Sequence, residues 1–253
     1  TAPSLLKLAG AIALDRDYEV VCLQVILTPR HTSPSETVVR TAKSRRLLRQ
    51  AENLGRQLGL PIHTQIRIAH DAAQAILETI KQEHIDSIIM GWHGETSVPG
   101  RVFGTVVDTV IRQAACQVVL VKLGNSSLTT NNIKSLTTDN CRRWLLLMAG
   151  GPNSQQAIQL LPALVTLSDK SEIRLTQVFL PSKTAPNTKK LEQAAEFLLR
   201  KINCPVITTT LCGHSVPDAA IDLAQKDQCD AIVLGASREG MLQQAIKGNI
   251  PEA

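Results

Sequence analysis

The chain has 253 residues, 43% of them apolar, and a formal net charge of +5 at pH 7. It is long enough for one large domain or two ordinary domains with a buried core. Aromatic residues make up only 2% and the basic residues are spread out. This argues against a nucleic-acid partner, because neither a stacking platform nor a known binding motif accompanies the charge.

The apolar residues and the cysteines restrict the class of protein further. No uninterrupted apolar stretch reaches the roughly 18 to 20 residues that a membrane span requires. The six cysteines include no CxxC pair, and most fall in or beside predicted strands, where a free thiol behaves as a small apolar side chain. These features favour a folded protein in a reducing, cytoplasmic setting.

The first half of the chain alternates helical and strand patterns. Apolar periodicity and turn residues predict, in order, a helix over 3–15, a strand over 19–27, a helix over 34–58, a strand over 61–68, a helix over 71–83, a strand over 85–90, a helix over 104–115 and a strand over 117–122. Short aliphatic strands that alternate with helices are typical of a parallel sheet covered by helices on both faces.

The helix over 34–58 has the clearest boundaries. Ser33 is placed as its N-cap, Pro34 occupies the first helical position, and Glu36 is placed to close a capping box. The pattern also predicts a buried stripe along this helix, made of Leu47, Ala51, Leu54 and Leu58.

The second half of the chain repeats the first. The matched segments are 60–77 with 204–221 and 85–91 with 229–235, both at an offset of 144 positions, and 19–27 with 172–180 at an offset of 153. We therefore expect two tandem copies of one α/β domain, each a doubly wound parallel five-stranded sheet. The copies cover 1–123 and 141–253, and the Ser-, Thr- and Asn-rich stretch 124–140 reads as a linker.

The two copies differ at their ends. The second copy opens with the strand RWLLLMAG over 143–150, which has no counterpart in the first copy. The segment IRQAACQVVLVKL of the first copy, which holds its last strand, has no counterpart in the second. Since the first strand usually lies in the middle of such a sheet, we expect the first copy to lack its central strand and the chain to be part of a longer polypeptide.

The stretch GWHGETSVPGRVFGT over 91–105 is the candidate functional loop of the first copy. Gly91 ends a strand, Gly94 follows, and Gly104 and Thr105 begin a helix. Glycines let a backbone approach a ligand closely, and a helix start presents free N–H groups to an anion. Arg101 could add a charge-assisted contact to a phosphate. By spacing alone, a phosphate cradle and a flexible turn remain alternatives.

This pattern resembles the nucleotide motif of the universal stress protein family, in its ATP-binding branch: Gly-x-x-Gly, nine residues, then Gly-Ser/Thr. The resemblance extends over nearly the whole chain as two tandem copies. It implies ATP or another adenine nucleotide, with or without Mg²⁺, whose phosphates lie against Gly91, Gly94, Gly104 and Thr105. The base and ribose would be held by the ends of the first two strands. An Asp that commonly ends the family's first strand falls on the strand missing from copy one.

The corresponding loop of the second copy departs from this motif. Gly235 and Gly248 keep the outer glycines, but Arg238 replaces the second glycine and Asn249 the Ser or Thr. Ala149 stands where the family would place Asp. A bulky side chain at position 238 should obstruct close backbone approach, so we expect this copy to bind nucleotide poorly and to serve a structural or pairing role.

Several other residues have ordinary explanations. His70 and His214 occupy equivalent positions, where capping of backbone groups is favoured over a shared ligand role, and His93 is expected to be exposed. A basic face on the second helix is interpreted as solvated rather than lipid-binding; it holds Arg40, Lys43, Arg45, Arg46 and Arg49. No metal-ligand cluster, nucleophile elbow or P-loop lysine is present, so efficient ATP hydrolysis is not expected.

These inferences converge on a regulatory module rather than an enzyme. The chain resembles the tandem domains at the cytoplasmic end of some bacterial membrane transporters and channels, of the chloride-channel and amino-acid-permease types. That resemblance implies tethering to the inner face of the membrane through the membrane part of its own polypeptide, and pairing of the two copies within one chain or across a homodimer. A free-standing tandem stress protein, a nucleotide-free interaction scaffold and, last, an enzyme are the alternatives.

Overall fold

The computed structural model describes residues 2–28, 34–92, 102–123, 141–148, 152–179, 181 and 187–238. The side chains of residues 34–40 are not described. Contacts divide the described residues into two compact units, which we call unit 1 (residues up to 123) and unit 2 (residues from 141).

Unit 1 contains every helix and strand that the first half of the sequence predicts, with ends shifted by at most two residues. Its elements are α1 (Ala2–Arg16), β1 (Val20–Leu27), α2 (Pro34–Leu58), β2 (Ile62–Ala69), α3 (Ala72–Gln82), β3 (Ser87–Trp92), α4 (Thr105–Gln113) and β4 (Gln117–Lys122). The Asp71 carboxylate caps α3 by accepting hydrogen bonds from the N–H groups of Ala73 and Gln74.

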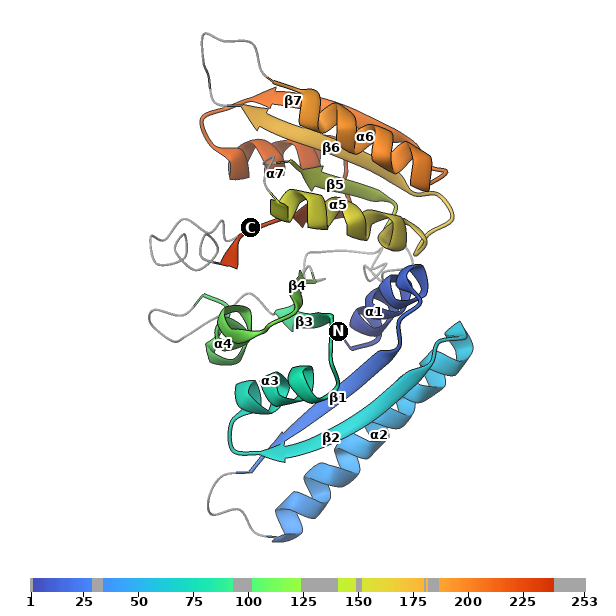
Figure 1. The fold of residues 1–253 in the computed structure, drawn as a ribbon, viewed down its shortest axis with the longest axis vertical. Coiled ribbons are helices and arrows are strands. Elements are labelled where there is room, and N and C mark those ends of the chain that lie inside the picture. The colour runs from blue at the N-terminus through green and yellow to red at the C-terminus, as the bar shows by residue number, and fades with distance from the viewer. Residues whose placement is uncertain are drawn as a thin grey trace, which may run out of the picture. The chain divides into compact units, whose positions relative to one another are not determined.

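The strands of unit 1 form two separate sheets rather than one. β1 pairs in parallel with β2, and β3 pairs in parallel with β4 (Figure 1). Among the described residues no strand lies between β1 and β3. This is the position in which the sequence predicts that the central strand is lacking.

Unit 2 forms one parallel four-stranded sheet in the order β7-β6-β5-β8. Its elements are β5 (Arg143–Leu147), α5 (Pro152–Val165), β6 (Glu172–Phe179), α6 (Lys189–Lys201), β7 (Val206–Cys212), α7 (Val216–Lys226) and β8 (Ala231–Leu234). β5 lies inside the sheet, and its side chains Leu145 and Leu146 are 0% exposed. Burial on both faces explains why this strand is a continuous apolar run.

The strand pairs of the two units share one register. Val20 pairs with Ile62 in unit 1, and Ile173 pairs with Val206 in unit 2. These positions are separated by the same offsets, 153 and 144, that align the two halves of the sequence. His84 and Gln228, also related by the second offset, both adopt the left-handed backbone conformation, with φ values of 51° and 52°.

The buried face of α2 differs from the predicted stripe. Leu47 and Leu58 are 45% and 40% exposed, so their predicted burial is wrong. Ala51 and Leu54 do pack against the apolar cluster of unit 1, but the face toward the sheet also includes Ser44, Leu48 and Gly55. A side chain at Gly55 would have its Cβ 2.3 Å from Ile62 Cδ1. This close approach places Gly55 on the side of the helix that faces β2, which the predicted stripe did not include.

Two other expectations for α2 have different outcomes. The predicted capping box cannot be compared, because Ser33 and the side chains of Pro34 and Glu36 lie outside the described residues. The basic side chains that the structure describes are exposed along the helix, as expected for a solvated face; they are Lys43, Arg45, Arg46 and Arg49. None of the described helices is long and apolar enough to cross a membrane.

All six cysteines are free. Burial, followed by the charge of Asp230, raises the pKa of the Cys141 thiol from 9.0 to about 12. The reactive thiolate of Cys141 is therefore about 1,000-fold rarer at neutral pH than that of an ordinary thiol, although the higher nucleophilicity of a more basic thiolate offsets part of this.

We expect iodoacetamide to modify Cys141 at least about tenfold more slowly than the exposed Cys212 in the folded chain at pH 8. Because the pKa is raised, the Cys141 rate should keep increasing with pH up to about 12. Mass spectrometry of digested samples measures both rates, and the same reaction in urea is the control, since unfolding should equalise them. Equal rates in the folded chain would contradict this prediction.

Candidate functional site

The glycine loop, residues 91–105, connects β3 to α4 at the carboxyl end of the β3–β4 sheet. Gly91 still belongs to β3 and pairs with Val121. Gly104 is the N-cap residue of α4, with a φ of 100°, and Thr105 is the first helical residue and is exposed. The structure thus describes three of the predicted site residues. Gly94 and Arg101, together with His93, lie outside the described residues.

Glycine is favoured at position 104 by the backbone conformation rather than by a lack of space for a side chain. A φ of 100° lies in the region that favours glycine, whereas a Cβ built at this position would meet nothing within 4 Å. The backbone there is open to its surroundings. The first N–H groups of α4 have no partner within their own helix, so this end of the loop offers donors and a positive helix dipole to an anion.

An aromatic contact joins the two ends of the glycine loop. The rings of Trp92, at the end of β3, and Phe103 pack edge to face with centroids 4.9 Å apart and an interplanar angle of 86°. Lys122, the last residue of β4, places its Nζ 5.2 Å from the centroid of the Trp92 ring. This contact brings a basic side chain to the same edge of the sheet.

The Asp108 carboxylate secures the end of the loop. Asp108 lies in the first turn of α4 and is 0% exposed. Its Oδ2 accepts a hydrogen bond from the N–H of Val102 and its Oδ1 one from the N–H of Phe103, each at 3.0 Å. A buried carboxylate is stable when its oxygens accept such bonds and a helix N-terminus lies beside it. Asp108 therefore fixes the backbone that leads into Gly104.

Sequence reasoning missed Asp108 as a site residue. The available signal was an acid in the first turn of the helix that follows the loop, which is a common helix-start preference. That preference alone does not reveal which backbone groups the carboxylate accepts from.

The carboxyl ends of β1 and β2 are joined by His70. Its Nδ1 lies within hydrogen-bonding distance of the carbonyl oxygen of Thr28, which follows β1. This contact agrees with the structural role favoured for His70 over ligand binding. Beside it, Leu27 and Ile68 are 45% and 56% exposed. Because Ile68 pairs with Ile26 and Leu27 with Ala69, these two exposed side chains lie on opposite faces of the β1–β2 pair.

In unit 2, the glycine after β8 has a packing requirement. A Cβ at Gly235 would lie 2.2 Å from the carbonyl oxygen of Asn153 and 2.7 Å from the nitrogen of Ser154. The strand end therefore packs directly on the backbone at the start of α5. Arg238 is exposed, whereas Ala149, Gly248 and Asn249 lie outside the described residues.

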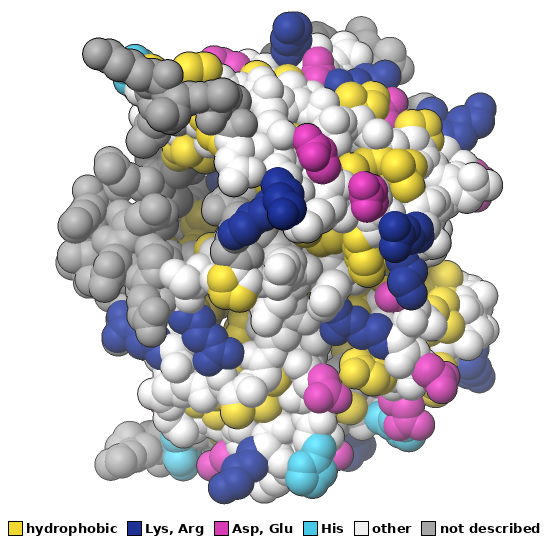
Figure 2. Space-filling model, turned by 45° about the horizontal axis from the view of Figure 1, so that its top comes forward, with side chains coloured by type: hydrophobic (Ala, Val, Ile, Leu, Met, Phe, Trp, Pro, Cys, Tyr) yellow, Lys and Arg dark blue, Asp and Glu magenta, His cyan; other side chains and the backbone are white. Residues whose placement is uncertain are grey.

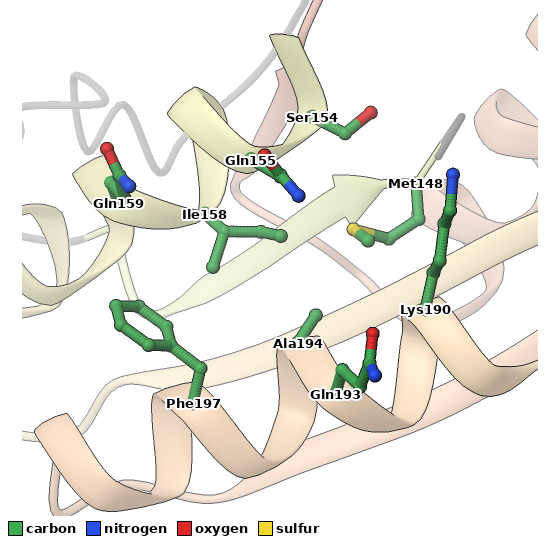
Figure 3. A pocket seen from close by; sticks show the side chains of 9 residues that line it. All are labelled: Met148, Ser154, Gln155, Ile158, Gln159, Lys190, Gln193, Ala194 and Phe197. Carbon is green, nitrogen blue, oxygen red and sulfur yellow. The ribbon is translucent and has the colours of Figure 1, made fainter. Parts of the chain in front are cut away.

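Unit 2 also has a cavity of about 350 Å³ between α5 and α6, which sequence reasoning did not anticipate (Figure 3). It is lined by Met148, Ser154, Gln155, Ile158, Gln159, Lys190, Gln193, Ala194 and Phe197. The glycine after β8 does not line it. The cavity lining combines amide, hydroxyl and apolar side chains with one lysine, and this mixture does not indicate a particular ligand.

Surface charge and possible metal ligands were also considered as features of the candidate site. Basic and acidic side chains are interspersed on the face of the molecule in Figure 2. The part of the chain that the structure describes contains no group of three or more His, Cys, Asp or Glu side chains able to hold a metal ion.

Comparison with known proteins agrees with this architecture. The model of the universal stress protein family matches residues 1–122. The Na⁺/H⁺ antiporter NhaS5 of Synechocystis sp. is 32% identical over 124 residues, which are 49% of this chain and 18% of the antiporter. A universal stress protein of Methanocaldococcus jannaschii is 28% identical over 123 residues, which are 46% of this chain and 72% of that protein.

Among solved structures, a universal stress protein from Archaeoglobus fulgidus superposes with a TM-score of 0.61 at 13% sequence identity. The match covers 99% of this chain and 90% of that chain. Residues 1–122 are therefore similar to the universal stress protein family, and the chain has the α/β fold with parallel strands seen in universal stress protein structures.

Proposed function

We propose that unit 1 binds an adenine nucleotide, ATP in the first instance, and acts as a regulatory module. The observation that supports this most directly is the glycine loop, whose end is fixed by Asp108 and whose two ends are joined by the Trp92–Phe103 contact. A site organised before its ligand arrives does not have to order a loop on binding, which favours affinity.

In this proposal the phosphates lie against the backbone at Gly91, Gly94 and Gly104 and accept hydrogen bonds from the first N–H groups of α4. The Thr105 hydroxyl and the Arg101 guanidinium add contacts to the phosphate oxygens. The base lies at the carboxyl ends of β1 and β2, beside one of the two exposed apolar side chains there, Leu27 or Ile68. Mg²⁺, if it accompanies the nucleotide, would be held mainly by phosphate oxygens and water.

We infer sensing rather than turnover from the chemistry of the loop. Its sequence has no lysine after the glycines to stabilise phosphoryl transfer, and its backbone donors suit the charge of a bound phosphate. Nucleotide occupancy can regulate a partner only if the nucleotide binds two arrangements of the protein unequally.

We further propose that the two units are tandem copies and that unit 2 is a degenerate copy with a structural or pairing role. The shared strand register and the matching left-handed residues His84 and Gln228 support a common pattern. Gly235 packs on the backbone at the start of α5, where a side chain would not fit. This supports packing, rather than ligand binding, as the reason that unit 2 retains this glycine.

The setting we propose is cytoplasmic, as the regulatory part of a membrane transporter. The match to part of an antiporter supports this setting. A free-standing stress protein remains the alternative, supported by the match that covers 72% of a universal stress protein. Nucleotide-dependent transport by the full-length polypeptide would separate the two.

Calorimetric titration with ATP, with and without Mg²⁺, tests the binding site. We expect Gly104→Ala to weaken binding at least about tenfold, because alanine at a φ of 100° is strained by roughly 1–2 kcal/mol and the loop end must shift to relieve it. Gly59→Ala is the matched control: Gly59 has a φ of 67°, a Cβ there meets nothing within 4 Å, and it lies in the turn after α2.

Gly104→Ala and Gly59→Ala should lose similar amounts of stability, but only Gly104→Ala should lose affinity. Gly94→Arg, which imitates Arg238 of unit 2, should also abolish binding. The nucleotide proposal fails if the unaltered chain binds no ATP, or if both Gly104→Ala and Gly94→Arg bind it with unchanged affinity. The first of these outcomes would favour a nucleotide-free scaffold.

A further inference from the structure

The exposed side of α2 is strongly basic. Residues 41–58, the part of this helix whose side chains the structure describes, contain five basic residues and one acidic residue. The basic residues are Lys43, Arg45, Arg46, Arg49 and Arg56, and all five are exposed. The other side of α2 packs against β1, β2 and α1 (Figure 1). The positive charge of this helix therefore faces away from the core of unit 1.

The one described acid of α2 does not neutralise this side. Glu52 is half-buried, and its Oε1 accepts a hydrogen bond of 2.6 Å from the Thr64 hydroxyl of β2. Burial, followed by the charge of Glu52, raises the pKa of the Cys22 thiol on β1. Glu52 thus lies toward the sheet. The sequence alone favours a solvated basic face here, but it does not reveal that the acid of the same helix turns inward.

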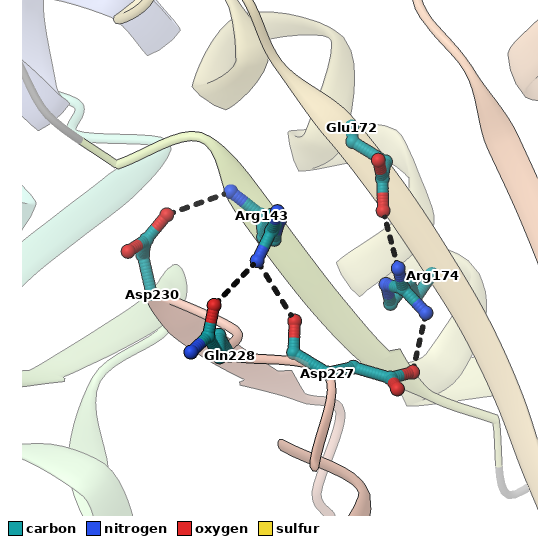
Figure 4. Close-up of polar contacts among 6 residues, drawn as sticks. All are labelled: Arg143, Glu172, Arg174, Asp227, Gln228 and Asp230. Atoms are coloured by element: carbon teal, nitrogen blue, oxygen red, sulfur yellow. Dashed lines mark hydrogen bonds and ion pairs between the residues drawn. The ribbon is translucent and has the colours of Figure 1, made fainter. Parts of the chain in front are cut away.

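Two arginines of unit 2 show the contrasting arrangement. The Arg174 guanidinium forms ion pairs with the Glu172 carboxylate, at 2.8 Å, and with the Asp227 carboxylate (Figure 4). The Arg143 guanidinium donates hydrogen bonds to the Asp227 carbonyl oxygen at 3.2 Å and to Gln228 Oε1 at 3.4 Å. These two side chains are held by groups within the fold, whereas the basic side chains of α2 extend into solvent.

The helix at the same place in unit 2 has a balanced surface. α6 follows β6 and precedes β7, as α2 follows β1 and precedes β2. It carries Glu192 and Glu196 among its lysines and arginines, and Arg200 forms an ion pair with Glu196, one turn away, at 3.7 Å. Such exposed pairs contribute little to stability, but they leave less unbalanced charge. The strongly basic surface is therefore a property of α2 rather than of the repeated pattern.

We propose that the basic side of α2 binds the surface of a lipid bilayer that contains anionic lipids. The five basic residues are spread over about 20 Å of the helix axis. Anionic headgroups in a bilayer can move to each of them, and every basic side chain held near such a surface adds to the attraction. The contact is electrostatic, so it weakens as salt is added.

The arrangement of the charges favours a bilayer over a compact acidic ligand. Arg45 and Arg49 lie one turn apart on one flank of the exposed side, and Lys43 and Arg46 lie on the other flank. Side chains that diverge in this way do not close on one phosphate or one carboxylate. A bilayer presents many headgroups, so convergence is not needed. Leu47, which is 45% exposed, follows Lys43 by one turn and enters the headgroup region beside it.

Sedimentation of the full chain with lipid vesicles tests this surface. In about 0.1 M salt, vesicles of phosphatidylcholine with roughly 30% phosphatidylserine should bind the chain at least about tenfold more strongly than vesicles of phosphatidylcholine alone. The triple variant Arg45→Gln, Arg46→Gln, Arg49→Gln should weaken this binding at least about 20-fold, because each basic side chain near anionic lipid contributes about fivefold. Glutamine is a good helix former, so the variant should fold, and thermal unfolding checks this.

A triple variant of α6 is the matched control. Lys189→Gln, Arg200→Gln, Lys201→Gln removes the same charge from exposed positions of unit 2 and should bind the anionic vesicles within about threefold of the unaltered chain. The proposal is overturned if the two kinds of vesicle bind equally, or if both triple variants lose affinity equally. Tighter binding to poly-glutamate or duplex DNA than to the anionic vesicles, lost in the α2 variant, would also overturn it and assign this side to an acidic protein or a nucleic acid. None of these results depends on ATP.

Discussion

Replacing Asp108 with alanine is expected to weaken ATP binding by unit 1 between about 10- and 100-fold. The substitution leaves the N–H groups of Val102 and Phe103 without their carboxylate acceptor. A buried donor that loses its partner costs about 1–3 kcal/mol, and the loop end will move to reach water instead. This movement removes Gly104 and the start of α4 from the geometry that receives the phosphates. Calorimetric titration measures the affinity, and thermal unfolding measures the accompanying loss of stability.

Two variants on the same helix serve as controls for Asp108→Ala. Asp108→Asn keeps the shape and one acceptor oxygen but points an amide donor at the other N–H, so its affinity should lie between those of alanine and aspartate. Arg112→Ala changes an exposed side chain of α4 and should bind normally. If Asp108→Ala lowers stability yet binds ATP as tightly as the unaltered chain, the nucleotide does not use this end of the loop.

Replacing Gly235 with alanine is expected to destabilise unit 2 by about 3 kcal/mol. The new Cβ would lie 2.2 Å from the carbonyl oxygen of Asn153, 2.4 Å from its carbonyl carbon and 2.7 Å from the nitrogen of Ser154. These are backbone atoms, which cannot rotate away as a flexible side chain does, so β8 and the start of α5 must separate. Overpacking of this kind commonly costs 1–3 kcal/mol. Urea denaturation followed by hydrogen exchange of β8 reports the loss.

Gly213→Ala is the matched control in the same unit. A Cβ at Gly213 would meet the Ala219 Cβ at 3.5 Å, which is an ordinary contact. Its stability should therefore change by less than about 1 kcal/mol. Equal destabilisation by the two substitutions would mean that loss of glycine, rather than the close approach at Gly235, determines the effect. ATP affinity of unit 1 should be unchanged in both variants.

The helices and strands were predictable because each is a short, regular pattern bounded by turn residues. β5 (Arg143–Leu147) is a good example. Its four consecutive apolar residues, Trp144 to Leu147, predict a strand buried on both faces, and all four are buried. The phase of α2 was not predictable in the same way. The prediction placed the leucines in the buried stripe, whereas the side of the helix that meets the sheet includes Gly55, which lies close to Ile62 of β2.

The candidate site was predictable in its location but not in its mechanism of organisation. Glycines and a helix start place Gly91, Gly104 and Thr105 at the carboxyl end of a parallel sheet, a common ligand position. The role of Asp108 depends on where the loop backbone turns, which no local pattern specifies. Gly235 illustrates a different difficulty. A glycine at the end of a strand suggests a phosphate site in the sequence, but here glycine is required because the backbone packs closely on the start of α5.

Two of the residues that secure the glycine loop belong to the strand and the helix that flank it. Trp92 belongs to β3, and Asp108 belongs to α4. The contacts described there join Trp92 to Phe103 and Asp108 to the backbone of Val102 and Phe103. Modest changes in the length of the segment between them should therefore cost little stability, since they alter the closure free energy of a loop by only tenths of a kcal/mol. In the proposed site, Asp108 therefore serves two purposes at once, because it holds the loop backbone in place and sets the geometry that receives the phosphates.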